Sequence, residues 1–528
     1  MLPEIYDHLP PPHITLQILS VLSLAYTVIL VVGRLYFSPI SNVPGPRLAA
    51  ATSLYEFYYN VVKGGKFFLR IQELHDEYGP IIRLGPNEVH ISDPTFYSTI
   101  YSLTEKRNKV GRLYQNAFWA RKSSFSTLDH DHHRLRRSMV NQFFSTAKIR
   151  TFAPWIQERA NLLCERFNNE FRVRNENEDK SKEKILNLTD AFSCLTADTI
   201  MEYSFAEHYN LCAKKDFKSD LIKILVVFFG QIHVLINFPS LLYLQMAVLP
   251  RWFVLWLDPI NRVIFTYMDN LLTQITTTLS GTSQSHQDVS HSTIFADILS
   301  TKKAPPQEKS KERLFDEAQV VVSAGLETTG NALAVAMFYI LEDGEVLRKL
   351  KEEMDGVWGE LEAGEDGEAQ RLSYGPIARL PRIAPNQTLT YTNPETNTTY
   401  PLPPGTIMST SIYTMHQNTV LFPDPQAFLP SRWLPDPVTG EAPRAPSLPS
   451  SASKGSEKLS SYLVTFGKGS RSCPGMNLAW AEMYITLANV IRKCDMQLWE
   501  TGRENVVPDK EYFLSRPRVD GGVRVRVL

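Results

Sequence analysis

The chain has 528 residues, with 55 Lys and Arg against 56 Asp and Glu, which gives a formal net charge of −1. Hydrophobic residues at 43% and charged residues at 21% are ordinary globular values and exclude a disordered chain, which combines low hydrophobicity with high net charge. The near-zero net charge argues against a nucleic-acid partner, because neutralising phosphates requires a surplus of Lys and Arg. The five cysteines are odd in number and show no CxxC spacing, which argues against a disulfide framework and a thiolate zinc site.

An apolar segment near the N-terminus predicts a membrane anchor. Residues 14–32 contain no charged side chain and are followed by Arg34. At a helical rise of about 1.5 Å per residue, such a segment approaches the ~30 Å hydrocarbon thickness of a bilayer. A cleaved signal peptide is the alternative, but Glu4 and Asp7 stand where such a peptide carries basic residues.

The basic residues around this segment predict which side of the membrane the body occupies. Arg34 and Arg47 follow the segment and no Lys or Arg precedes it, so the positive-inside rule places the body in the cytosol. The Pro-rich stretch 42–47 predicts a stiff turn between anchor and body. We therefore expect four segments: a lumenal tail over 1–13, a transmembrane anchor over 14–33, a hinge over 34–47 and one large domain over 48–528.

A second apolar zone covers residues 221–257. Polar residues and two prolines, Pro239 and Pro250, interrupt it, so it contains no clean spanning segment. Two interpretations remain open: buried core helices, or a patch that dips into the lipid surface without crossing it.

The body is predicted to be mainly α-helical with a minor β component and a single core. Residues 81–92 indicate a hairpin around a Gly-Pro-Asn turn, and helical periodicity dominates from about 129 to 356, most clearly over 152–171 and 314–341. Short β-like segments and Pro-rich turns follow from 388, and one more helix is expected near 476–493. The Ser- and Pro-rich interval 435–461 is typical of a surface insertion.

The most informative stretch is Phe466-Gly-Lys-Gly-Ser-Arg-Ser-Cys473-Pro-Gly475. Three glycines in ten residues permit tight backbone conformations around a single cysteine that precedes a helix. Backbone amides and the helix N-terminus are expected to lower the pKa of such a thiol. A nucleophile and a single-point metal ligand are both possible roles for Cys473, but no Cys/His protease signature accompanies it.

The spacing F-x-x-G-x-R-x-C-x-G is similar to the haem-binding loop of the cytochrome P450 superfamily. The resemblance covers the chain from about Pro44 onward and is closest to fungal secondary-metabolism members such as trichodiene-oxygenase-like enzymes. It implies the cytochrome P450 fold behind one transmembrane helix, with Cys473 as the axial ligand of haem b iron, where a thiolate favours O–O cleavage. It also implies that Arg471 contacts a haem propionate and that Phe466 packs near the ligating sulfur.

A second motif, Ala324-Gly-Leu-Glu327-Thr328-Thr329, lies on the predicted long helix. Taken alone it is equally typical of a helix-packing face, and a Thr there can bond the i−4 carbonyl. Beside the thiolate loop it resembles the oxygen-binding groove of the same family. The resemblance implies that Glu327 and Thr328 deliver protons to bound dioxygen, and this pair argues against peroxide-driven or rearrangement chemistry.

Weaker matches occur in the order of the family. His133 and Arg137 are one helical turn apart and resemble the helix pair that holds the propionates, and Arg382 resembles another propionate contact. Arg432, in F-x-P-x-R-W, resembles the arginine of a structural Glu–Arg pair. His416 is expected to be structural or solvated.

The resemblance further implies a reaction and its partners. Electrons would come from NADPH through a separate reductase at an endoplasmic reticulum membrane, and one oxygen atom would enter a lipophilic substrate, such as a terpenoid or polyketide intermediate. Lys468, Arg134 and Arg136 form an expected basic docking patch for the reductase. The substrate is expected to contact four segments: 109–125, 221–257, the helix around Ala324 and 377–383.

The segment before Arg371 breaks the family pattern. Glu368 and Arg371 have the required Glu-x-x-Arg spacing, but residues 359–367 contain three glycines and no amphipathic face, so a helix is not favoured there. A missing segment would explain this, with Glu368 matching by accident and Arg371 and Arg432 lacking a buried carboxylate. The alternative function is therefore a truncated, non-catalytic membrane protein with impaired haem binding.

Overall fold

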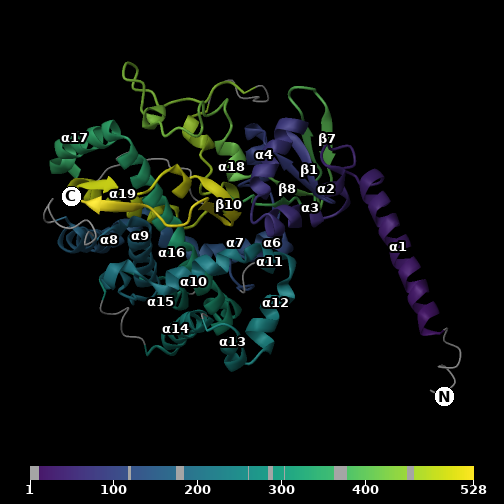
Figure 1. Cartoon of the computed structure of the whole chain (residues 1–528), viewed down its shortest axis with the longest axis horizontal. Coiled ribbons are helices and arrows are strands. Elements are labelled where there is room, and N and C mark those ends of the chain that lie inside the picture. The colour runs from purple at the N-terminus through teal and green to yellow at the C-terminus, as the bar shows by residue number, and fades with distance from the viewer. Residues whose placement is uncertain are drawn as a thin grey trace.

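The computed structural model describes residues 11–116, 120–173, 184–259, 261–282, 289–301, 304–361, 377–448 and 457–528. It is mainly helical. Strands β1 (Ile81–Gly85), β7 (Thr399–Leu402) and β8 (Ile407–Ser409) lie on the side from which the N-terminal helix projects, whereas the strands next to the C-terminus lie at the opposite end of the body (Figure 1). The predicted fold class, mainly α with a minor β part, is thus confirmed.

The long helix α16 (Lys311–Glu342) forms the centre of the helical part. It packs most extensively against α9 (Leu188–Phe205), a helix that is buried along almost its whole length. Two glycines of α16 allow this close approach: a Cβ on Gly325 would lie 2.7 Å from Ile200, and one on Gly330 would lie 2.8 Å from the Ser193 backbone. The helices α8 (Thr146–Arg166), α14 (Asn261–Ser280) and α19 (Met476–Lys493) complete this core.

The five-stranded sheet has the order β1-β2-β8-β5-β3. Its strands are β1 (Ile81–Gly85), β2 (Glu88–Ile91), β3 (Asn108–Lys109), β5 (Arg382–Ile383) and β8 (Ile407–Ser409). β2 and β8 run parallel and the other neighbours antiparallel. The register of β3 on β5 sets Lys109 opposite Arg382, so two cationic residues distant in sequence become neighbours.

Three smaller sheets complete the β component. A C-terminal hairpin joins β10 (Pro508–Tyr512) to β11 (Leu514–Pro517). β12 (Arg524–Val527) lies between β4 (Leu186–Asn187) and β9 (Met496–Leu498), and β6 (Leu389–Thr392) pairs with β7 (Thr399–Leu402). The remaining helices are α2 (Arg47–Ala51), α3 (Leu54–Phe57), α4 (Phe67–Tyr78), α5 (Tyr97–Ile100), α6 (Gly111–Tyr114), α7 (His130–Asn141), α10 (Asp220–Gly230), α11 (Ile232–Asn237), α12 (Pro239–Tyr243), α13 (Arg251–Leu257), α15 (Ile294–Ser300), α17 (Gly344–Leu361) and α18 (Ile412–His416).

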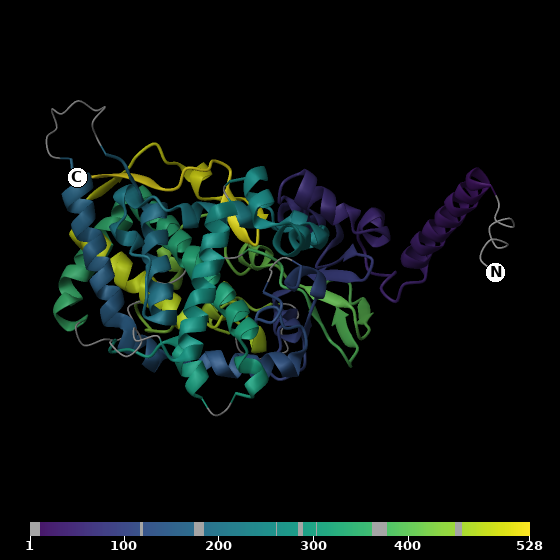
Figure 2. The same cartoon turned by 90° about the horizontal axis from the view of Figure 1, so that it is seen from below.

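Helix α1 (Pro12–Tyr36) extends away from the body in both views (Figures 1 and 2). It is long and apolar enough to cross a membrane, and its apolar side chains are exposed. Its base is attached to the body: the buried Arg83 donates to the Arg34 carbonyl at 2.8 Å, and Arg34 donates to the Ala51 carbonyl at 2.8 Å. α16 passes the same test of length and hydropathy but is mostly buried, as expected of a core helix.

Several local predictions are confirmed and one is wrong. The hairpin over 81–92, the long helix over 314–341 and the helix over 476–493 are present. Contrary to our expectation, residues 359–361 are helical, because α17 continues to Leu361. Residues 362–376, including Glu368 and Arg371, lie outside the described residues.

Three buried histidines hold the β-rich part together. His75 contacts the Gly79 carbonyl through Nδ1 at 2.8 Å and His90 Nδ1 through Nε2 at 2.7 Å, and His90 Nε2 accepts from the Ser411 amide at 2.8 Å. His416 Nε2 accepts from the Val464 amide at 3.0 Å, which makes it structural. Burial lowers the pKa of His75 and of His416 to about 4.

We therefore expect acid to destabilise the fold before most carboxylates titrate. The unfolded chain binds a proton at His416 below pH 6.5 while the folded chain stays neutral, so stability is full above pH 6.5 and falls as the pH drops toward 4. His416→Gln retains an acceptor for the Val464 amide but cannot titrate. Between pH 7 and 4 the wild type should lose about 3 kcal/mol more unfolding free energy than this variant, measured by denaturant titration. Equal losses would contradict the assignment.

Candidate active site

The loop 466–475 is shaped by its glycines and by the residues beneath it. The Cys473 amide donates to the Phe466 carbonyl at 2.8 Å, which closes the loop immediately before α19. Gly469 has φ +74°, and a Cβ there would lie 2.2 Å from the Tyr101 carbonyl oxygen, so the loop can rest on this backbone only with glycine at that position. The Phe466 ring lies against Trp480, with the ring centroids 5.5 Å apart.

Cys473 differs from the other four cysteines because its side chain is accessible while theirs are buried. Burial of the surrounding site raises the pKa of the Cys473 thiol, although the Gly475 amide and Arg137 oppose the rise. Our expectation of a lowered pKa is therefore wrong for the protein alone, because desolvation outweighs the helix N-terminus. A stable thiolate at this position requires a further positive partner, such as a metal ion.

Five basic side chains gather beside this cysteine. Arg471 lies on the loop itself, His133 and Arg137 lie on α7, and Lys109 and Arg382 face each other across β3 and β5. The side-chain hydrogen bonds that the structure describes for Lys109, Arg382 and Arg471 all go to neutral acceptors. Arg471 donates to the Thr127 carbonyl at 2.6 Å and to the Leu128 carbonyl at 2.8 Å.

Lys109 and Arg382 converge on one tyrosine. Arg382 donates to the Tyr114 hydroxyl at 2.8 Å, and Lys109 Nζ lies 4.2 Å from the centre of the Tyr114 ring. Lys109 also donates to the Phe125 carbonyl at 2.5 Å. Tyr114 thus fixes the direction of both cations.

The electrostatics of this cluster indicate a missing anion. Burial lowers the pKa of Arg471 to about 9, with a further contribution from Arg382, and burial together with Arg471 lowers the pKa of Lys109. In the part of the chain that the structure describes, His133 Nδ1, Arg137 Nε and Arg471 Nε are buried without a hydrogen-bond partner. Buried cations of this kind require an anionic partner, so the cluster fits a ligand with carboxylate groups.

The motif Ala324–Thr329 lies on α16, and its residues Glu327 and Thr328 point in different directions. Successive residues of an α-helix point about 100° apart. The Thr328 hydroxyl donates to the Ala324 carbonyl at 2.8 Å, as its mid-helix position predicts. Glu327 is buried and forms an ion pair with Arg516 on β11. Burial raises the pKa of Glu327, while Arg516 opposes the rise.

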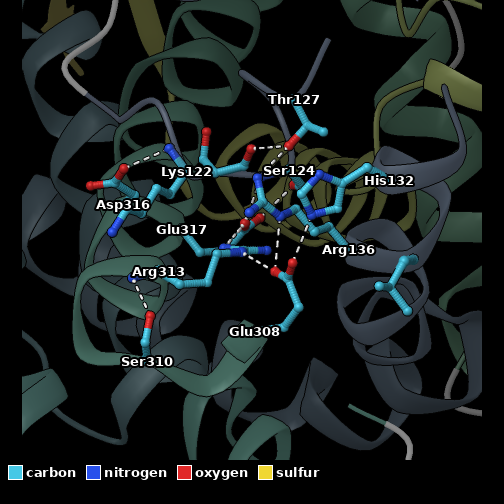
Figure 3. Close-up of polar contacts among 12 residues, drawn as sticks. Lys122, Ser124, Thr127, His132, Arg136, Glu308, Ser310, Arg313, Asp316 and Glu317 are labelled. Atoms are coloured by element: carbon cyan, nitrogen blue, oxygen red, sulfur yellow. Dashed lines mark hydrogen bonds and ion pairs between the residues drawn. The ribbon is translucent and has the colours of Figure 1, made fainter. Parts of the chain in front are cut away.

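A buried ionic network fixes the segment 120–129 that supports Arg471 (Figure 3). The Glu308 carboxylate pairs with three side chains, at N···O distances of 2.7 Å to His132, 2.8 Å to Arg136 and 3.0 Å to the buried Arg313. Although burial raises the pKa of Glu308, these partners lower it to about 2.

The network extends to both sides of Glu308 (Figure 3). Arg313 also pairs with Glu317 at 2.5 Å, and Glu317 accepts from the Ser124 amide at 2.7 Å. On the other side Arg136 donates to the Thr127 hydroxyl at 2.8 Å, and the Thr127 carbonyl accepts a hydrogen bond from Arg471. The start of α16 is thereby connected to the cationic cluster.

The remaining predicted site residues are placed as follows. Arg432 donates to the Pro423 carbonyl and, at 3.3 Å, to the Asp424 carbonyl. Arg136 belongs to the buried network, and Lys468 lies near the rings of Tyr97 and Tyr462, so two of the three residues expected in a basic docking patch are engaged inside the protein. That part of the prediction is wrong, because charge on a predicted helix does not tell which face packs inward; Arg134 is exposed.

Lys109 and Tyr114 lie in the segment 109–125 predicted to contact the substrate, but were not predicted to belong to the cationic cluster. Arg516 and the Glu308–Arg313–Glu317 group were not predicted as functional residues. The sequence around Lys109 carries several other charges and does not single this lysine out, and the contacts of these residues depend on long-range packing. Among the described residues, no group of three or more His, Cys, Asp and Glu could hold a metal ion. Cys473 is therefore suited to a metal ion whose other ligands come from a cofactor and not from protein side chains.

Comparison with known proteins identifies the ligand that would bind at Cys473 and the cationic cluster. The sequence model described as cytochrome P450 matches residues 50–520. The chain belongs to the cytochrome P450 family. It is 35% identical over 518 residues to conidiogenone synthase PchP450 of Penicillium rubens, covering 94% of this chain and 96% of the relative.

Two further relatives are similar over nearly their full lengths. Cytochrome P450 monooxygenase TRI4 of Fusarium sporotrichioides is 30% identical over 527 residues (94% of this chain, 92% of the relative). Tryptophan 6-hydroxylase fscE of Fusarium equiseti is 32% identical over 515 residues (94% of each). The chain is thus a cytochrome P450 monooxygenase with a haem cofactor, and this full-length similarity does not favour the truncated, non-catalytic alternative.

The residues present fit haem. An accessible thiol on a glycine-rich loop matches a haem iron, and the unpartnered nitrogens of His133, Arg137 and Arg471 match propionate carboxylates. The fit rests on the charge of the cluster rather than on Cys473 alone.

The ionic network predicts that haem retention depends on a residue remote from the thiolate loop. Glu308→Gln leaves Arg136 and Arg313 without their shared carboxylate, which should destabilise the fold by about 3–5 kcal/mol and displace the Thr127 carbonyl from Arg471. Purified protein should show a lower ratio of haem to protein absorbance and a lower thermal midpoint. Glu312→Gln, an exposed carboxylate four residues later at the start of α16, should change neither value; equal effects of the two substitutions would contradict the role of the network.

Proposed function

We propose that this chain is a membrane-bound haem-thiolate monooxygenase of fungal secondary metabolism that oxidises a lipophilic intermediate with electrons from NADPH. The observation that carries the proposal is the accessible Cys473 beside His133 and four cationic side chains, none of which forms an ion pair with a carboxylate among the described residues. When bound, haem supplies the iron at which dioxygen is activated and one oxygen atom is transferred to the substrate.

Each residue of the site has a proposed task. Cys473 binds the iron, and Arg471, Arg137 and His133 hold propionate oxygens. Lys109 and Arg382 add positive charge at the same edge, oriented by Tyr114. Phe466 covers the loop on the side of Trp480 and keeps water from that side of the sulfur. Of the structural pair, Glu368–Arg371 is a proposal from spacing alone, and Arg432 orders the turn at 423–424.

Glu327 and Thr328 are proposed to move protons on the oxygen side of the haem. The Thr328 hydroxyl keeps its proton on the Ala324 carbonyl and can turn to donate it elsewhere. Glu327 Oε2 is buried without a hydrogen-bond partner in the described residues, so this oxygen is free to take up and release a proton.

The substrate is proposed to lie between α16 around Ala324, the segment 109–125 and the C-terminal hairpin. The Phe125 and Phe513 rings lie edge to face, with centroids 5.9 Å apart, and form an apolar boundary between the last two. Aromatic walls of this kind suit a terpenoid or polyketide skeleton. The conidiogenone synthase among the relatives is a second reason to test such intermediates.

The membrane contact is proposed to include the second half of the apolar zone as well as α1. In the first half of this zone, Phe229, Ile232 and Ile236 are buried. In the second half, Phe238, Trp252, Trp256 and their apolar neighbours are exposed. The Phe238 ring meets Phe57, edge to face, with centroids 5.9 Å apart, so this exposed surface continues onto α3 near the base of α1. We propose the endoplasmic reticulum as the location, with the NADPH-dependent reductase docking on the cytosolic side.

The thiolate assignment is tested by replacing its sulfur. Cys473→Ser should abolish the characteristic thiolate absorbance of the reduced carbon-monoxide complex and reduce oxidation of substrate by more than about a hundredfold, because loss of the ligand itself should exceed the roughly 10–100-fold cost of losing an outer-shell partner. Cys194→Ala, at a buried cysteine of α9, should retain both. A Cys473→Ser protein with an unchanged spectrum and undiminished oxidation would overturn the proposed function.

The membrane patch is tested with the full chain in vesicles that contain brominated lipids. Bromine quenches tryptophan fluorescence at short range, so the wild type should be quenched by these lipids. The double substitution Trp252→Phe and Trp256→Phe should remove a large part of the quenchable signal, because both side chains are more than two-thirds exposed. If the quenched fraction is the same in both proteins, the proposed contact is wrong.

A further inference from the structure

The carboxylate of the oxygen-groove motif is held by a residue far away in sequence. Arg516 on β11 pairs through Nη2 with Glu327 Oε1, and both side chains are largely buried, with 15% and 7% of their surfaces exposed. Ion pairs this deep cost desolvation and persist where the surrounding structure fixes both partners. The pair therefore reports a specific attachment between α16 and the C-terminal hairpin.

The two oxygens of Glu327 have different surroundings. Oε1 faces Arg516, while Oε2 has no hydrogen-bond partner in the described residues. Of the charged groups that the structure describes, Arg516 is the one that acts on Glu327. Neighbouring titratable groups are engaged elsewhere: Glu482 of α19 bonds Thr329, and Tyr267 of α14 lies 3.3 Å from Ser323.

The hairpin that carries Arg516 also contacts α11, which lies in the apolar zone 221–257, and the segment 109–125, which is proposed to meet the substrate. The Glu511 carbonyl contacts His233 of α11 at 2.6 Å, and the Phe513 ring at the turn contacts Phe125. Phe513 has φ +70°, so the turn holds this side chain in an unusual backbone conformation. A shift of either segment would be transmitted through the hairpin to Arg516.

We propose that Arg516 is the positioning residue of Glu327: it holds the carboxylate by Oε1, leaves Oε2 to carry the proton, and makes proton delivery depend on the position of the C-terminal hairpin. This inference rests on the proposed role of Glu327. Without Arg516 the carboxyl group keeps its burial but loses its cation, so it retains its proton at higher pH and delivers it less effectively.

The first test measures the titration of Glu327 directly in the full-length, haem-loaded enzyme. Infrared difference spectra across pH follow the carboxyl C=O band, and Glu327→Gln identifies the band by removing it. Arg516→Gln should raise the midpoint of this titration by about 1 to 3 pH units, and Arg516→Lys should restore most of the difference. Arg518→Gln, an exposed arginine two residues further on, should leave the midpoint unchanged. A midpoint in Arg516→Gln equal to that of the wild type would overturn the inference.

The second test measures the consequence for the reaction. The fraction of consumed NADPH recovered as hydrogen peroxide should rise severalfold in Arg516→Gln and in Glu327→Gln. The double variant should be no worse than Glu327→Gln alone, because both substitutions remove one function; additive effects would overturn the inference. A peroxide fraction in Glu327→Gln equal to that of the wild type would instead overturn the proposed role of Glu327, while the infrared titration still decides whether Arg516 controls its charge.

Discussion

Positive charge without a protein counter-charge is the constraint around which the structure is organised. Lys109, Arg137, Arg382 and Arg471 come from the five-stranded sheet, α7 and the cysteine loop, and like charges this close repel one another. Burial and these four cations lower the pKa of His133, which keeps its imidazole neutral. Backbone carbonyls and the Tyr114 ring only partly offset that repulsion. The fold therefore supplies the cations, and a dianionic cofactor would supply the matching negative charge. Cofactor binding and folding stability are coupled for this reason.

The framework that keeps these cations in place is itself ionic and buried. Glu308 and Glu317 form ion pairs with Arg136 and Arg313 next to the cluster, whereas the cations of the cluster itself have no carboxylate ion-pair partner among the described residues. This arrangement leaves the unpaired charge where the propionates are proposed to bind. It also explains why α7, despite its many basic residues, offers few of them to a partner protein.

The features that depend on residues close together in the sequence could be predicted from the sequence alone. The glycine-rich loop, the Thr328 back-bond, the 81–92 hairpin and α19 each depend on residues within about ten positions, and all could be predicted from the sequence. Lys109 opposite Arg382, Arg516 on Glu327 and the inward direction of Arg136 join segments tens to hundreds of residues apart, so only the three-dimensional arrangement reveals them. The thiol pKa was mispredicted for a related reason: the helix N-terminus is visible in the sequence, whereas the depth of burial is not.

The attachment of α1 has a consequence for how the molecule meets its substrate. Arg83 is buried in the first strand and holds the last turn of α1, and Gly45 packs against the same strand so closely that a Cβ would lie 2.7 Å from the Arg83 carbonyl oxygen. In the proposed bilayer-bound state the body thus has little freedom to swivel about its anchor. A hydrophobic molecule that diffuses laterally within the leaflet would encounter the same flank of the protein, between α3 and α12, at every collision, and the search for the catalytic chamber would become nearly two-dimensional.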